Sequence, residues 1–280
     1  MIRQRTIKET VTIEGAGLQT GAKVTMTLKS SPANSGINFI RTDLPNKPLL
    51  NLQSMDFSDP ASSNMPERRT TLIMGPLQIQ TTEHFLAALS GFGIDNIVAE
   101  LSGLELPGLD GSARGFLDNL KKAGRVEQDA PKKMLKVDKA VWCRTNDSIL
   151  IVLPYDHFKI SYTLSYDNPF IGNQFFSVVL DEESFANEVA PARTFCLEAE
   201  ALELLKRGLG KGSSYDNTLV IGKDGPVNTR ARFPDEPVRH KVLDLIGDLY
   251  MLGMPIQGHV VAVKSGHRLN MEMVRRLKLE

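Results

Sequence analysis

Hydrophobic and polar residues alternate along two separate stretches of the chain, from Glu9 to Lys29 and from Met134 to Asp167. Alternation with a period of two is typical of strands that bury one face. Later in each part comes an apolar segment with helical spacing, which starts at His84 in the first part and at His240 in the second. The pattern therefore predicts a sheet and helices in each part of the chain.

The order of the predicted elements repeats: a helix, a strand, a Ser-Gly pair and a second helix. In chain order these elements lie at 84–91, 96–101, 102–103 and 112–123, and again from His240, at 259–263, at 265–266 and from there to the end. Convergence on similar units is an alternative, but the repeated Ser-Gly pair favours duplication.

The polar stretch from Glu127 to Lys133 is the natural boundary between the two parts. We therefore expect two domains, residues 1–127 and residues 128–280. The predicted fold class is α+β, in which each half is a sheet that carries its helices on one face.

Composition narrows the class of protein. The 280 residues are 41% hydrophobic, which is enough for a large core. The 33 basic and 33 acidic residues balance, so a nucleic-acid partner is disfavoured. Cys143 and Cys196 are expected to be reduced thiols. No signal peptide and no apolar run of membrane-spanning length is found. We expect a cytoplasmic protein that acts as a monomer.

The most informative segment is His240–Asp248, where one histidine and two carboxylates recur at steps of four. On a helix, His240, Asp244 and Asp248 form one stripe, and the residues between them are mostly apolar. Buried titratable groups need a partner, and His nitrogen and Asp oxygen are good zinc ligands. A salt-bridged helix whose carboxylates meet arginines elsewhere is the alternative that this segment leaves open.

A second segment places Glu83 and His84 at the start of an otherwise apolar helix, after the threonine pair at 81–82. We expect a threonine cap at this helix start. His84 is a candidate third ligand, with Glu83 beside the metal but unbound. A capping glutamate with a hydrogen-bonded core histidine is the alternative. Because position 88 is Ala88, the helix lacks the two histidines, four apart, of a thermolysin-like protease.

A third segment, Lys264–Asn270, presents His267 on a small-residue turn directly after an apolar strand. A histidine at a strand exit is well placed for proton transfer, although a surface histidine is the simpler interpretation. Since one candidate ligand lies in the first half and two lie in the second, the metal is expected at the interface between the halves.

Seven ordered motifs together resemble the UDP-3-O-acyl-N-acetylglucosamine deacetylase family, the zinc amidases that commit Gram-negative bacteria to lipid A synthesis. The motifs are Gly15–Gly21, Thr82–Asn96, Leu109–Ala113, Ala192–Phe195, Val238–Lys241, the acidic helix segment His240–Asp248, and Ser265–His267. Two positions depart from the family pattern, Gln19 and Ser213, and both concern loop conformation.

The resemblance implies one catalytic zinc, with ferrous iron as an alternative metal, held by His84, His240 and Asp244. It also implies three catalytic roles: Glu83 as general base, His267 as the acid that protonates the leaving amine, and Asp248 as the support of that histidine. Thr194 is implied as an oxyanion stabiliser. Phe195 and Lys241 are implied as contacts to the sugar and the diphosphate, and Phe170 as the aromatic that stacks on uracil. Zinc with three protein ligands keeps one open position and lowers the pKa of bound water toward roughly 7.

The segment from Phe195 to Gly225 is rich in leucine, with Leu197, Leu202, Leu204, Leu205 and Leu209. These leucines could be ordinary core, whereas the resemblance implies an apolar passage for the acyl chain of the substrate. Two other functions remain open: a related zinc amidase acting on another acylated amine or sugar, and a non-catalytic protein that binds a nucleotide sugar.

Overall fold

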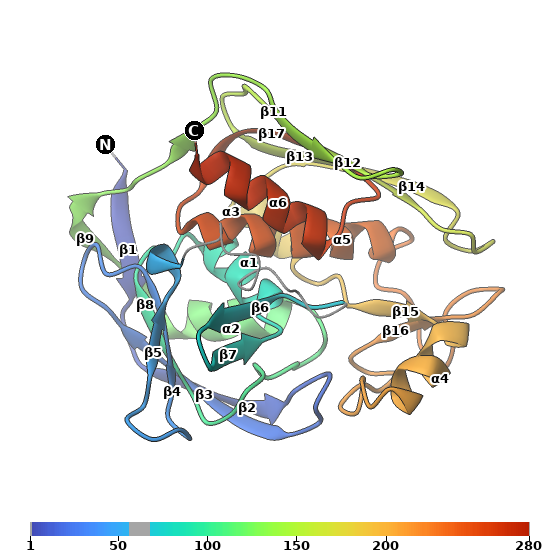
Figure 1. Ribbon diagram of the computed structural model, residues 1–280, viewed down its shortest axis with the longest axis horizontal. Coiled ribbons are helices and arrows are strands. Elements are labelled where there is room, and N and C mark those ends of the chain that lie inside the picture. Colours follow the sequence, from blue (N-terminus) through green and yellow to red (C-terminus); the bar gives the residue numbers. More distant parts are fainter. Residues whose placement is uncertain (1, 56–67, 280) are drawn as a thin grey trace.

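Two mixed sheets enclose a double layer of helices in the computed structural model, which describes residues 2–55 and 68–279. The sheet from the first half of the chain lies on one side of the helices and the sheet from the second half lies on the other (Figure 1). Each sheet therefore carries helices on one face only, and the helices of the two halves meet in the centre of the molecule.

The first sheet has the strand order β2-β3-β8-β4-β5, and only β4 and β8 pair in parallel. Its elements are β2 (Val11–Ala16), β3 (Lys23–Ser30), β4 (Ile37–Arg41), β5 (Leu49–Asn51) and β8 (Ile97–Leu101), together with the helices α1 (Glu83–Phe92) and α2 (Arg114–Ala123). Inward-facing residues alternate along the strands, as the burial of β3 shows.

The second sheet has the order β11-β12-β17-β13-β14, with β10 added beside β17. Its elements are β10 (Leu135–Lys136), β11 (Val141–Arg144), β12 (Ile149–Leu153), β13 (Phe158–Ser165), β14 (Asn173–Val179) and β17 (Ile256–Val263), together with the helices α5 (Glu236–Leu249) and α6 (His267–Lys278). As in the first sheet, the two central strands, β13 and β17, are parallel, and the chain segment that connects them contains a central helix, α5.

The two halves share one topology. In each sheet the first two strands form an antiparallel hairpin, the last strand of the set is inserted centrally, and a helix follows it. Thus α1 corresponds to α5, and α2 corresponds to α6. The predicted α+β class with two pseudo-repeated halves is confirmed.

The polar stretch at 127–133 is not an irregular linker. Most of it belongs to β9 (Arg125–Pro131), which pairs antiparallel with β1 (Arg3–Ile7). Its charged residues form ion pairs across this ribbon, such as Arg3 with Asp129, so a polar sequence is compatible with a strand here. Hydrogen bonding therefore extends the first half past residue 127, and the division into residues 1–127 and 128–280 stays a prediction.

Smaller elements complete the chain. They are the hairpin β6 (Thr71–Met74) and β7 (Leu77–Gln80), the short helical turns η1 (Leu52–Ser54), α3 (Glu182–Ser184), η3 (Phe185–Val189) and η4 (Tyr250–Leu252), and an insert made of β15 (Phe195–Leu197), α4 (Glu198–Lys206) and β16 (Leu219–Ile221). The insert lies beside the layered body, beyond the N-terminal end of α5 (Figure 1). None of the helices in the described part of the chain is long and apolar enough to cross a membrane.

The helices α1 and α5 approach each other closely at Gly247. A Cβ atom added to this glycine would lie 2.0 Å from the carbonyl oxygen of Glu83. The absence of a side chain at Gly247 therefore lets the two helix backbones touch. This contact joins the halves at the position where the candidate site residues lie.

Candidate active site

The two central helices bring together His84 from α1 and His240 and Asp244 from α5, and all three residues are buried. One Asp244 oxygen, Oδ1, lies 3.7 Å from His84 Nε2 and 3.3 Å from His240 Nε2. Donor atoms at about 2.0–2.1 Å from a tetrahedral zinc ion lie about 3.3–3.4 Å apart. The three side chains therefore fit the size and chemistry of a metal site.

The ring of His240 is fixed in a ligand-like orientation. Its Nδ1–H donates to the carbonyl oxygen of Ala192 at 3.0 Å, which leaves Nε2 as the nitrogen that faces Asp244 and His84. Histidines that bind metals typically donate their other ring nitrogen in this way. The two histidine rings are edge to face, with their centroids 5.0 Å apart.

The carboxylate of Asp244 is surrounded by nitrogen atoms. Besides the two histidines, Lys241 Nζ donates to its Oδ2 at 2.9 Å. Burial acts to raise the pKa of Asp244, but His240, Lys241 and His84 together hold it well below its usual range. Burial lowers the pKa of His84, which favours the neutral imidazole that binds metals. Among the described residues, no arginine contacts Asp244 or Asp248, so the predicted alternative of arginine-paired carboxylates is not what this helix shows.

Glu83 faces the same space from the first turn of α1. Its Oε2 accepts a hydrogen bond from the backbone N–H of Thr70 at 3.0 Å. Burial raises the pKa of Glu83 to about 8; the charge of His267 opposes this shift, and the carboxylates of Asp244 and Asp248 add to it. A threonine, Thr82, is the N-cap residue of α1, as predicted. Its side chain makes no capping hydrogen bond, and its buried hydroxyl has no partner among the described residues.

His267 opens α6 and is held by Asp248 on α5. Its Nδ1 lies 2.8 Å from Asp248 Oδ2, and Asn270 Nδ2 donates to the same oxygen at 2.8 Å. The hydroxyl of Thr70 donates to the other oxygen of Asp248. Burial acts to lower the pKa of His267, but Asp248, Asp244 and Glu83 raise it to about 9. The arrangement favours a protonated imidazole at neutral pH.

Thr194, Phe195 and Lys241 line the same cavity as the candidate ligands, together with Glu83 and His267. The ring of Phe195 stands edge-on to that of His240, at a centroid distance of 6.3 Å, and Lys241 Nζ lies 5.7 Å from the centroid of Phe195. The structure thus brings these three predicted residues to one place, although Lys241 is engaged by Asp244.

Phe170 lies elsewhere. It sits on the turn between β13 and β14, where its backbone N–H donates to Asn168 Oδ1 and its ring lies against Gly225. The ring is 37% exposed, and Phe170 is not part of the cavity lining formed by the described residues. Phe170 therefore lies apart from the other predicted site residues, and its contact with uracil stays a prediction.

Three cavities adjoin one another here. The site cavity, of about 140 Å³, shares Leu18, Gln19 and Thr194 with an apolar cavity of about 260 Å³ beneath the insert. It also shares Lys241 and His267 with a cavity of about 580 Å³. The cationic residues that line this third cavity are Arg68, Lys241, Lys264 and Arg268, and Arg68 lines all three cavities. The polar site cavity thus adjoins both an apolar and a basic cavity.

Helix α4 of the leucine-rich segment forms part of the wall of the apolar cavity, whereas Leu197, directly before the helix, packs against the core. No residue of α4 is buried, and Leu204 and Leu205 line the cavity. Leu209 lies beyond the helix, whose last residue is Lys206. The predicted alternative of ordinary core leucines therefore does not hold for α4.

Several residues that build this site could not be identified from the sequence. Thr70 precedes β6 and has no spacing that connects it with Glu83 or Asp248, so no local pattern could identify it. The Ala192 carbonyl and the close backbone approach at Gly247 are equally invisible to periodicity. Asn270 lies within a motif quoted above, but its contact with Asp248 depends on the packing of α6 against α5.

Comparison with known proteins gives consistent matches along the chain. A family model described as UDP-3-O-acyl N-acetylglycosamine deacetylase matches residues 4–278. A UDP-3-O-acyl-N-acetylglucosamine deacetylase of Anaeromyxobacter sp. (strain Fw109-5) is 42% identical over 98% of this chain and 88% of its own length. Proteins of the same name from Pseudomonas entomophila and Bdellovibrio bacteriovorus are 40% and 39% identical, over 100% and 99% of this chain and 91% and 90% of theirs.

Proposed function

Because the chain belongs to the UDP-3-O-acyl-N-acetylglucosamine deacetylase family, we propose that it removes the N-acetyl group of UDP-3-O-acyl-N-acetylglucosamine. The products are acetate and UDP-3-O-acyl-glucosamine, and the reaction is the committed step of lipid A biosynthesis. The observation that carries this proposal is the convergence of two histidines, Asp244, Glu83 and His267 in one cavity.

His84, His240 and Asp244 are proposed to hold one catalytic zinc ion, with ferrous iron as the alternative metal. Support comes from the spacing of their donor atoms and from the hydrogen bond that fixes the His240 ring. A metal ion held by these residues supplies Lewis-acid polarisation of the amide carbonyl and a water molecule of lowered pKa.

Glu83 is proposed as the general base that takes a proton from the attacking water. Its carboxylate is buried beside the ligand cluster and accepts a hydrogen bond from the backbone N–H of Thr70. A nearby cation favours the ionised carboxylate over the protonated form. Glu83 would therefore be ready to accept a proton at neutral pH in the metal-loaded enzyme.

His267 is proposed as the acid that protonates the departing amine. Asp248 accepts from its Nδ1, so Nε2, which lies 3.9 Å from Asp244 Oδ2, is the nitrogen that would carry the transferred proton to the substrate. A raised pKa keeps this imidazole protonated until the amine needs the proton. Asp248 thus acts through His267, as an orienting and charge-stabilising group.

The remaining predicted residues are proposed to bind the substrate. The Thr194 hydroxyl would stabilise the oxyanion of the tetrahedral intermediate, and Phe195 would contact the sugar. Lys241 and the other cations of the basic cavity would meet the diphosphate. For Phe170, the predicted contact with uracil has no support from its position on the β13–β14 turn.

The apolar cavity beneath the insert is proposed to take the 3-O-acyl chain. Each buried methylene contributes about 0.8 kcal/mol, so losing several of them weakens the productive complex by orders of magnitude. UDP-N-acetylglucosamine without the acyl group should therefore have a far lower kcat/KM than the acylated compound. Equal values would shift the assignment toward an amidase with a different substrate.

One experiment tests the proposal as a whole. The purified protein should contain about one equivalent of a divalent metal and should release acetate from UDP-3-O-acyl-N-acetylglucosamine, and a chelator should abolish the release. Metal without acetate release would indicate a related amidase on another acylated amino sugar. Binding of the nucleotide sugar with neither metal nor turnover would indicate a binding protein.

A further inference from the structure

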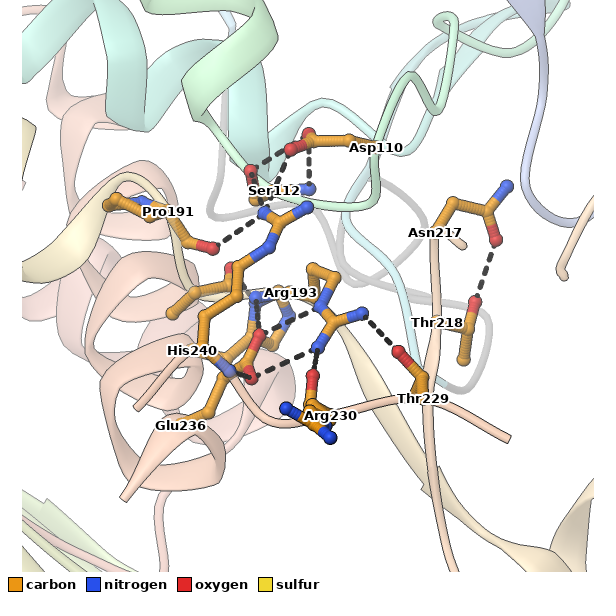
Figure 2. A network of polar contacts seen from close by, with 12 residues as sticks. Asp110, Ser112, Pro191, Arg193, Asn217, Thr218, Thr229, Arg230, Glu236 and His240 are labelled. Carbon is orange, nitrogen blue, oxygen red and sulfur yellow. Dashed lines mark hydrogen bonds and ion pairs between the residues drawn. The ribbon is translucent and has the colours of Figure 1, made fainter. Parts of the chain in front are cut away.

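A buried ion pair that the proposed chemistry does not use lies one helical turn before His240. Arg193 is 3% exposed and Glu236, the first residue of α5, is 0% exposed. The guanidinium donates from Nε to Glu236 Oε1 at 2.9 Å and from Nη2 to Oε2 at 3.2 Å, and the backbone N–H of Arg193 adds a bond to Oε1 at 2.9 Å. Figure 2 shows the two side chains joined in this way.

The other donors of this network bind the chain on either side. Arg193 Nη1 donates to Thr229 Oγ1 at 3.2 Å, and Nη2 donates to the carbonyl oxygen of Arg230 at 2.6 Å. The backbone N–H of Arg232 donates to Glu236 Oε2 at 2.6 Å. The ion pair thus connects the start of α5 to two separate segments of the chain, one at residue 193 and one at residues 229–232.

The segment that Arg193 anchors, residues 191–194, carries two groups of the site. The carbonyl of Ala192 accepts from His240 Nδ1, and Thr194 lines the cavity that holds the candidate ligands. Arg193 lies between them in sequence; it is not among the described residues that line the cavity, and its side chain binds Glu236. We infer that the Arg193–Glu236 pair is a positioning device that holds Ala192 against His240 and thereby sets the metal affinity of the site.

The first half of the molecule also contacts the segment at residues 191–194. Arg232 Nη1 donates to the carbonyl oxygen of Pro191 and to Asp110 Oδ2, each at 2.8 Å. The backbone N–H of Thr194 donates to the carbonyl oxygen of Gly111 at 2.7 Å. Both ends of residues 191–194 are therefore fixed, and the Arg193–Glu236 pair fixes the middle. The motif Leu109–Ala113 thus has a position in the site that sequence analysis did not give it.

Energetics support a positioning role over a purely stabilising one. A buried ion pair is weak evidence for stability, because the cost of removing two charges from water offsets much of their attraction. Both side chains of this pair also hydrogen-bond to backbone groups, and these bonds fix the geometry of the pair. Partners that orient a metal-binding histidine typically change metal affinity by 10–100-fold when they are lost.

The inference rests on the proposed metal site. The experiment gives different results for a failure of the inference and for a failure of the proposed metal site. Zn²⁺ affinity is measured by competition with a chelator, and the Co²⁺-loaded proteins are compared by visible absorption. Glu236→Gln should weaken Zn²⁺ binding by about 10–100-fold and should alter the Co²⁺ spectrum. In the metal-free protein, the downfield proton resonance of His240 Nδ1–H should also exchange faster with solvent.

Asp235→Asn is the matched control. Asp235 neighbours Glu236 and also pairs with an arginine, Arg239, through a 2.6 Å contact, but Arg239 contacts neither Ala192 nor Thr194 in the described structure. This variant removes the same charge from the same helix start and should keep the metal affinity of the parent protein.

Arg232→Gln keeps the inference testable if Glu236→Gln does not fold. Its side chain is partly exposed, and its loss frees Pro191 from Asp110. It should weaken Zn²⁺ binding severalfold. A folded Glu236→Gln protein with the affinity of Asp235→Asn would overturn the inference, as would a folded Arg232→Gln protein with parental affinity. A parent protein that binds no metal would instead overturn the proposed function.

Discussion

The helices α5 and α4 both carry several leucines, yet they differ completely in packing. Every residue of α5 except Arg239 and Lys241 is buried, and the helix lies between the two sheets. No residue of α4 is buried, and Leu202 and Leu205 are 67% and 55% exposed. The helix that holds the reacting groups is thus fixed by packing on all sides, whereas the helix beside the proposed acyl chain keeps apolar surface free for a ligand.

This difference shows how one chain can combine precise chemistry with an adaptable substrate site. Catalytic side chains must be held within a fraction of an ångström, which requires packed neighbours and supporting hydrogen bonds. An alkyl chain needs only apolar contact, which an incompletely covered helix can supply. If this contrast holds, the rate depends on the packed helix, and binding of the alkyl chain depends on the exposed one.

The largest effect is expected from removing a proposed metal ligand on α5. His240→Ala should lose bound metal and, with it, activity to the background level, because only two ligands remain. Metal analysis and acetate release on the same sample measure both. Full activity in a chelated, metal-free preparation of the parent protein would contradict the proposed site.

Removing the proton-transfer groups should affect rate without affecting metal. Glu83→Gln and His267→Ala are each expected to lower kcat/KM on the order of 10²–10⁴, the usual contribution of a general base or acid. Metal content should stay near one equivalent in both. A variant that loses its metal instead would show that the altered residue is a ligand.

The pH profile should respond to Asp248. With Glu83 as base and His267 as acid, kcat/KM is expected to be bell-shaped in pH. The pKa of His267 is raised to about 9, so the acid is available below that pH and is lost as the pH rises through it. Asp248→Asn removes a carboxylate that raises this pKa. The alkaline limb should therefore move to lower pH, and an unmoved limb would rule out His267 as the acid.

A smaller effect is expected at the contact between α1 and α5. Gly to Ala in a helix interior normally stabilises by about 1 kcal/mol, but in Gly247→Ala the new methyl would lie against the Glu83 carbonyl. Overpacking of this kind costs about 1–3 kcal/mol, so the melting temperature and the metal affinity should both fall. Gly103→Ala is the control, because its Cβ would meet only Val24 at 3.5 Å. Equal stability of the two variants would contradict the close helix approach.

The smallest effect is expected on α4. Leu204→Ala shortens a side chain that lines the apolar cavity and should lower kcat/KM for the acylated substrate about tenfold, which corresponds to about two methylenes of contact. Leu202→Ala alters an exposed leucine outside the lining and should change neither activity nor stability by more than about 0.5 kcal/mol. Equal losses in the two variants would show that α4 acts through folding rather than through the cavity.

Local spacing explains what the sequence could predict. The steps of four from His240 to Asp248 place the side chains on one face of a helix wherever that helix lies. Alternation identified β2 and β3 in the first sheet and β10 to β13 in the second, but not β4, β5 or β14. Thr70, the Ala192 carbonyl and the contact at Gly247 depend on which backbone segments meet, and no local pattern encodes that meeting. The strand β9 was missed because its polar residues pair only with β1, at the edge of the molecule.

The division of the site between the halves also sets the order in which it can form. Glu83 and His84 belong to the half that the ribosome makes first, whereas His240, Asp244 and His267 follow late in the sequence. The parallel pairing of β13 with β17 can form only after both strands have been synthesised, so the second sheet and its helices are completed late. By mass action, a bound metal ion therefore stabilises the state in which the two halves are docked. It does not stabilise either half alone during synthesis. Refolding in the presence of a chelator should still produce both sheets, but it should leave the junction between α1 and α5 as the part that opens most readily.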